Sequence, residues 1–241
     1  MRLKIDNNNA DRHVPKHKTT AREAYLFHLN LTIKGIVMKI GVLTVLLFFV
    51  GTNASYAADE AQLGESALAK GNYSTALVHF KNNLKLKTKK YGASHSDVAL
   101  AHLNLGRAYR KNGQYKKALS EFNLTFKLIS KIHGVNHHTA ASVHFHLSNV
   151  YMDMKKFDQA IVHMEKNVKI NATVYGANHS GMTMSYKALG IAYLKGKKYD
   201  QAIKYLEKSQ NLMKKELFIY KAELPSVEKY LALAKKGRSA K

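Results

Sequence analysis

Apolar residues recur at intervals of three and four positions from about residue 60 to residue 236, which is the spacing of one face of an α-helix. Short polar segments such as Asn112-Gly113 and His133-Gly134-Val135-Asn136 interrupt this pattern and predict turns. The helix before the first of these turns has its apolar face on Leu103, Leu105, Ala108 and Tyr109. The helix after it has its apolar face on Tyr115, Ala118, Leu119, Phe122, Phe126 and Ile129. The pattern therefore predicts helical hairpins.

The hairpins repeat with a period of 42 residues, without insertion or deletion. A leucine series falls on Leu63, Leu105, Leu147, Leu189 and Leu231, and it is followed by Gly64, Gly106, Ser148, Gly190 and Ala232. Further series are Tyr73, Tyr115, Phe157 and Tyr199; Ala76, Ala118, Ala160 and Ala202; Gly92, Gly134 and Gly176; and His95, His137 and His179. Because one hairpin cannot bury its apolar face alone, the units are predicted to stack into a solenoid.

Small and aromatic residues have distinct expected roles in this stack. Gly106, Gly190 and the alanine series are expected where the two helices of a hairpin approach closely, because larger side chains there would force them apart. The aromatic series is expected to wedge between neighbouring units. Both series are therefore assigned to the core.

The strings LGRAYRKNGQYKKAL, LSNVYMDMKKFDQAI and LGIAYLKGKKYDQAI resemble tetratricopeptide repeats. The 42-residue period and the linkers YGASHSDVA, HGVNHHTAA and YGANHSGMT are similar to the longer, kinesin-light-chain type of that repeat. The resemblance implies an all-α, right-handed superhelical solenoid over residues 58–236. Its four hairpins would span residues 58–95, 96–137, 138–179 and 180–222, and a capping helix over residues 226–236 would precede a basic tail at 237–241. The segment Leu217-Phe-Ile-Tyr220 lacks the linker glycine and histidine and departs from the pattern. A HEAT-type repeat is the alternative fold, and the Leu-Gly-x-x-Tyr and Gly-x-Tyr-x-x-Ala patterns argue against it.

The N-terminal residues resemble an export signal. Lys39 precedes the apolar block from Ile40 to Val50, and small residues follow it, so residues 38–57 are interpreted as a signal peptide cut before Ala58 or as a retained signal anchor. Residues 1–37 would then be a disordered extension or lie before the true start at Met38. Either interpretation exports the repeats, to the periplasm or the exterior if cleaved and otherwise membrane-anchored.

Composition limits the possible chemistry. The 39 Lys and Arg residues against 16 Asp and Glu give a net charge of +23, which should attract anionic surfaces. There is no cysteine, no glycine-rich phosphate loop after a strand and no nucleophile elbow, so an enzyme is not expected. His95, His137 and His179 occupy one repeat position and are interpreted as part of the linker pattern, so neither a metal site nor any other cofactor is expected.

In this family the first helices of successive hairpins line a concave groove that receives a peptide. Transferred position by position, the resemblance places eight residues in a partner-binding groove: Asn104, Arg107, Arg110, Lys111, Phe145, Asn149, Lys187 and Lys195. The sequence thus predicts a non-enzymatic adaptor that binds a protein or peptide segment of acidic or mixed charge. The alternative is a basic envelope-associated structural protein that binds anionic lipid or polymer through its outer surface. Nucleic acid is an unfavoured partner because no aromatic residues are interleaved with the basic ones.

Overall fold

The computed structural model of the protein describes residues 60–240, all of them within one unit of the chain, Asn53–Lys241. Every regular element in this range is helical. After a helix over residues 60–69 come α2 (Tyr73–Tyr91), α3 (Ser96–Lys111), α4 (Tyr115–His133), α5 (His138–Asp153), α6 (Phe157–Tyr175), the short 3-10 helix η1 (Ser180–Met182), α7 (Thr183–Lys195), α8 (Tyr199–Lys215), α9 (Leu217–Tyr220) and α10 (Leu224–Ser239). The segments expected at 1–37 and 38–57 lie outside the described residues.

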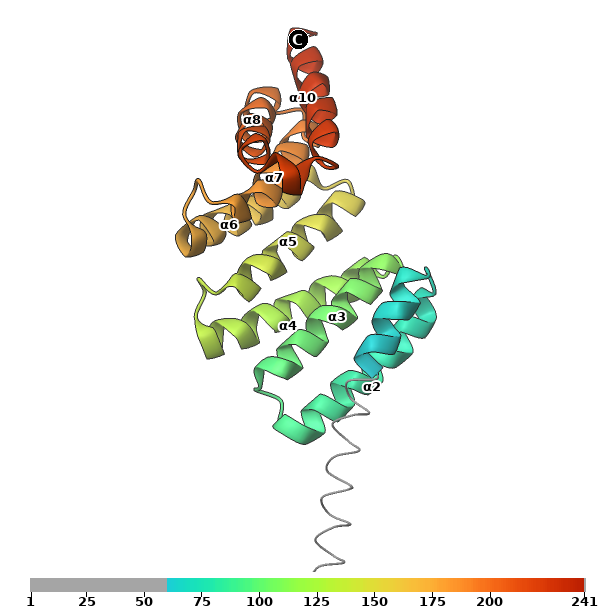
Figure 1. The fold of residues 1–241 in the computed structure, drawn as a ribbon. Coiled ribbons are helices and arrows are strands. Elements are labelled where there is room, and N and C mark those ends of the chain that lie inside the picture. Colours follow the sequence, from blue (N-terminus) through green and yellow to red (C-terminus); the bar gives the residue numbers. More distant parts are fainter. Residues whose placement is uncertain (1–59, 241) are drawn as a thin grey trace, which may run out of the picture. The chain divides into compact units, whose positions relative to one another are not determined.

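The helices form the four predicted hairpins and the predicted capping helix (Figure 1). Residues 60–69 pack on α2, where Gly64 faces Phe80 and Glu60 contacts His79. In the other hairpins α3 pairs with α4, α5 with α6, and α7 with α8. The second helix of each hairpin packs on the first helix of the next, and α10 covers α8 and α7. The predicted all-α solenoid is therefore confirmed. None of the helices between residues 60 and 240 is long and apolar enough to cross a membrane.

The two helices of each hairpin meet at a small residue. A Cβ atom added to Gly106 would lie 2.6 Å from Cε1 of Phe122, whose ring is completely buried. Gly64 faces Phe80, and Gly190 faces Leu206, in the same way. In the third hairpin Ser148 takes the small position, and its hydroxyl donates to the carbonyl oxygen of Ala160 at 2.8 Å. The expected close approach of the helices is therefore present.

The turn inside each hairpin needs one residue in the left-handed region. Gly71 and Gly113 occupy this position in the first two hairpins, with φ of 76° and 73°. In the third and fourth hairpins Lys155 and Lys197 replace them, with φ of 58° and 57°. A side chain with a Cβ atom is strained in this conformation, because Cβ approaches the neighbouring carbonyl oxygen.

The C-terminal helix is longer than the sequence pattern indicates. α10 begins at Leu224, with Pro225 in its first turn, and continues to Ser239. Residues 237–239, which were assigned to a basic tail, are therefore helical, and Gly237 lies against the ring of Tyr199. This contact needs a residue without a side chain, and it agrees with the expected place of Tyr199 between units.

Replacing Gly106 by Ser should lower the free energy of unfolding by about 1 to 3 kcal/mol, because the buried ring of Phe122 occupies the space of the new side chain. Adding Phe122→Met reproduces the combination of Ser148 and Met164 found in the third hairpin. The double variant should recover at least half of the lost free energy of unfolding. Urea unfolding would measure both variants. A double variant no more stable than Gly106→Ser would show that the ring does not set the helix spacing.

Replacing Lys155 by Gly should raise the free energy of unfolding by about 1 kcal/mol, because glycine adopts positive φ without strain. Lys155→Ala is the matched control, since it removes the same charge but keeps Cβ and should give no stabilisation. Thermal unfolding of the two variants would compare them. An equal gain from both would attribute the effect to charge rather than to the backbone.

Candidate functional site

A cavity of about 320 Å³ lies between the first helices of the last three hairpins. Its apolar walls come from Phe145 and Met152 of α5, Met184 and Ile191 of α7, and Met164 of α6. Met164 is almost completely buried, whereas Met184 is 49% exposed at the rim. The helical spacing of three and four residues therefore aligns apolar side chains of α5 and α7 along one groove.

Two ion pairs border this groove. In one pair Nε of Arg110 donates to Oδ2 of Asp153 at 2.7 Å, and its Nη2 donates to Oδ1 at 3.3 Å. In the other pair Nζ of Lys187 donates to Oε2 of Glu223 at 2.8 Å. The hydrogen bond from Lys187 holds the pKa of Glu223 below its ordinary value. Each pair joins one structural unit to the next, from α3 to α5 and from α7 to the segment before α10.

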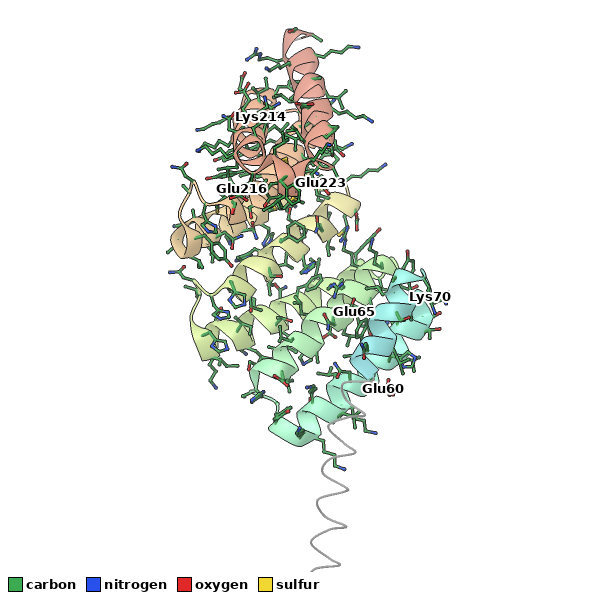
Figure 2. All side chains as sticks on the ribbon, viewed as in Figure 1. Glu60, Glu65, Lys70, Lys214, Glu216 and Glu223 are labelled. Carbon is green, nitrogen blue, oxygen red and sulfur yellow. The ribbon has the colours of Figure 1, made fainter. Side chains whose placement is uncertain are left out.

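A third pair lies one repeat earlier. Nη2 of Arg107 donates to Oε2 of Glu65 at 3.1 Å, and its Nη1 donates to Oδ1 of Asn104 at 3.1 Å. Figure 2 labels Glu65 and Glu223, the acidic partners in the first described helix and before α10. The arginine and lysine side chains at three of the predicted groove positions are therefore neutralised by carboxylates of neighbouring units.

The eight predicted groove residues fall into three groups. Arg110, Phe145, Asn149 and Lys187 line the 320 Å³ cavity. Asn104 and Arg107 form the network with Glu65 instead. Lys111 is exposed at the end of α3, and Lys195 borders a separate cleft between the turns of the third and fourth hairpins, together with Lys155 and Lys156.

Several residues of the groove were not predicted. Met184 and Ala188 lie on α7 at helical spacing from Ile191, and this spacing could have identified them. Met164 comes from a second helix, so a rule based on first helices omits it. Glu65 and Glu223 lie 42 and 36 residues from their partners in the sequence. No local sequence pattern identifies an ion pair between residues that far apart.

The linker histidines cap the helices that follow them. Nδ1 of His95, His137 and His179 accepts a hydrogen bond from the backbone N–H two residues later, at 3.1, 3.2 and 3.0 Å. Each ring also stacks on the aromatic residue four positions earlier, namely Tyr91, His133 or Tyr175. An N-cap requires a side-chain acceptor, which here is an imidazole nitrogen without hydrogen. The histidine series is thus structural.

The third hairpin holds three further histidines, His144, His146 and His163. His144 is buried, and its Nδ1 lies 3.1 Å from Nδ1 of His163 on α6. His146 stacks on Phe122, and its buried Nδ1 has no hydrogen-bond partner within the described chain. Burial lowers the pKa of both His144 and His146 to about 4, and the positive charges of Arg107 and Arg110 add to the effect at His146. Both rings are therefore neutral at physiological pH.

Within residues 60–240 no group of three or more His, Asp and Glu side chains is close enough to hold a metal ion. The His144 and His163 pair lacks a third ligand, whereas a protein zinc site uses at least three. The groove itself is lined by apolar side chains and by charged groups that already have partners. Such a surface is suited to contact with another molecule.

The fold and the groove define a class of helical-hairpin solenoid. The sequence profile of the tetratricopeptide repeat family matches residues 56–131 and 139–215, and the chain belongs to that family. Its fold is of the kinesin-light-chain-like type. The solved structure of a putative kinesin light chain with nearly identical repeats from Podosopora anserina has a TM-score of 0.65 at 19% identity, over 76% of this chain and 87% of that one.

BtubC, or BKLC, from P. vanneervenii has a TM-score of 0.58 at 15% identity, over 79% of this chain and 90% of that one. No curated protein sequence matches this chain. At these identities the two structures show the fold alone. The tetratricopeptide repeat assignment supports a role as a protein-interaction scaffold.

The two histidines with low pKa should make the fold less stable in mild acid. The unfolded chain, with histidine pKa values near 6.5, binds more protons than the folded chain between about pH 6.5 and 4. Stability is therefore full above about pH 7 and falls as the pH drops through this window. For His146 alone the loss between pH 7.5 and 5 is about 2 kcal/mol.

His146→Asn tests this, since Asn104 occupies the same position one repeat earlier. Urea unfolding of the variant should change less between pH 7.5 and pH 5 than that of the wild type. An identical pH dependence in both proteins would exclude His146 as its source.

Proposed function

We propose that the chain is a non-enzymatic adaptor that binds a protein segment with apolar and acidic side chains in the groove between α3, α5 and α7. The observation that carries the proposal is the apolar cavity bordered by two ion pairs. Burying ligand side chains against Phe145, Met152 and Ile191 would supply affinity. The charged groups of these pairs would fix the position of the ligand.

The unequal exposure of the two side chains in one ion pair supports an acidic ligand. The side chain of Lys187 is 12% exposed and held in the groove, whereas that of Glu223 is 48% exposed. A carboxylate of the ligand would compete with Glu223 for Lys187. Because exposed ion pairs contribute about 1 kcal/mol or less, such an exchange has a small cost.

The same proposal includes export. The signal-like block from Ile40 to Val50 supports placing the repeats outside the cytoplasm, as a cleaved or a membrane-anchored protein. The partner would then be another exported or envelope protein.

Neutral substitutions of the two partners in the Lys187 and Glu223 ion pair should change the affinity for a ligand in opposite directions. The probes are peptides selected on the full chain from a displayed random library, and fluorescence anisotropy measures their affinity. Selected peptides should carry Asp or Glu beside apolar residues. Lys187→Gln should weaken binding about 3- to 10-fold, and Glu223→Gln should tighten it about 2- to 5-fold by removing the competing carboxylate.

The apolar wall has its own matched pair of variants. Met184→Glu places a charge in the groove and should weaken binding at least about tenfold. Val78→Glu changes a similarly exposed residue on α2 and should have no effect. Peptides bound equally by Lys187→Gln, Met184→Glu and the wild type would disprove the groove assignment.

A further inference from the structure

The junction between α8 and α10 exposes three consecutive apolar side chains. Leu217 is 50% exposed, Phe218 is 100% exposed and Ile219 is 66% exposed. No residue of α9 is buried. Transfer of a phenylalanine or isoleucine side chain out of water is favourable by about 2 kcal/mol, so a fully exposed group of this kind is an interaction site or an aggregation hazard.

The repeat pattern shows that this exposure is specific to the fourth hairpin. Counting in steps of 42 residues, Phe218 takes the place of Gly92, Gly134 and Gly176, which all have positive φ. Lys221 takes the place of the capping histidines His95, His137 and His179. The most exposed large hydrophobic side chain among the described residues thus stands where each other linker has glycine.

The segment has a defined conformation. The backbone N–H groups of Ile219 and Tyr220 donate to the carbonyl oxygen of Glu216 at 3.0 and 3.2 Å. The hydroxyl of Tyr220 donates to the carbonyl oxygen of Ser180 at 3.4 Å, and its ring packs on the core of the last hairpin. The apolar side chains are therefore presented by a turn fixed on one side, which lowers the entropic cost of binding.

Lysines flank the three apolar residues in the sequence. Lys214 and Lys215 end α8, and Lys221 follows α9, all of them exposed. Of the two nearby carboxylates, Glu223 is paired with Lys187, and Glu216 is partly buried at the start of the turn. The local charge is therefore positive, which complements an anionic surface.

We propose that the tip formed by Leu217, Phe218 and Ile219 enters an anionic lipid bilayer while Lys214, Lys215 and Lys221 contact the headgroups. A bilayer fits better than a protein, because three side chains on a projecting turn bury far less than the roughly 800 Å² per partner of a stable protein interface. Membrane association, in contrast, combines a few inserted apolar side chains with lysines that each add attraction to anionic lipid. This surface is separate from the groove, and the inference does not depend on the proposed function.

The experiment uses a fluorescence probe at the tip, since the chain contains no tryptophan. Phe218→Trp in the full chain makes position 218 the source of indole emission, so lipid binding elsewhere in the chain does not contribute. Vesicles with 30% phosphatidylglycerol should shift the emission to shorter wavelength, and brominated lipids should quench it. Vesicles of phosphatidylcholine alone should give neither effect. Because Phe218 is fully exposed, the thermal unfolding midpoint should not change.

Two further variants test the contribution of the lysines and the location of the inserted site. Adding Lys214→Gln, Lys215→Gln and Lys221→Gln should weaken vesicle binding, measured by the shift, roughly tenfold to a hundredfold. Val78→Trp, at an exposed site on α2, should show no shift. The proposal is overturned if the indole at position 218 stays in water when anionic vesicles are present. It is equally overturned if the shift occurs without vesicles and rises with protein concentration, since a second copy of the chain would then cover the tip.

Discussion

The close packing of a small residue against a bulky one inside each hairpin is the constraint on which the rest of the structure depends. Gly64, Gly106 and Gly190 each allow a large side chain of the second helix to lie directly on the backbone of the first. This contact fixes the distance between the two helices, and the exact 42-residue period repeats it. Because neighbouring hairpins are therefore alike in thickness, first helices align with first helices, and a groove forms along them.

The ion pairs between units show how a strongly basic chain distributes its few carboxylates. Glu65, Asp153 and Glu223 all neutralise cations of the neighbouring unit on the groove side. Each such pair contributes little to stability, but together they leave the groove close to neutral and apolar. The excess positive charge remains on helix ends, hairpin turns and the tip before α10, where it is available to anionic surfaces.

Much of the fold could be predicted from the sequence, because the local spacing of apolar residues defines the helices of each hairpin. The 42-residue repeat shows the same spacing several times. The leucine, glycine and alanine series led directly to the helix contacts at Gly106 and Gly190. The groove was predicted less completely. Arg110, Phe145, Asn149 and Lys187 line its cavity, but Lys195, the last residue of α7, borders another cleft. The charge state of the groove was not predictable from the same spacing, since each acidic partner lies a whole unit away.

The hairpins share one backbone arrangement but differ in the side chains at one pair of facing positions, one on each helix. The helix positions 19 residues apart hold Glu60 with His79 in the first hairpin and His102 with Glu121 in the second, with nitrogen to oxygen distances of 2.8 and 2.7 Å. The third hairpin has His144 with His163, and the fourth has the packed rings of Tyr186 and Tyr205. In the third hairpin burial lowers the pKa of His144 to about 4 and also lowers the pKa of His163, and two protonated rings at this distance would repel each other. Acid therefore weakens the third hairpin, which supplies Phe145, Met152 and Met164 to the groove.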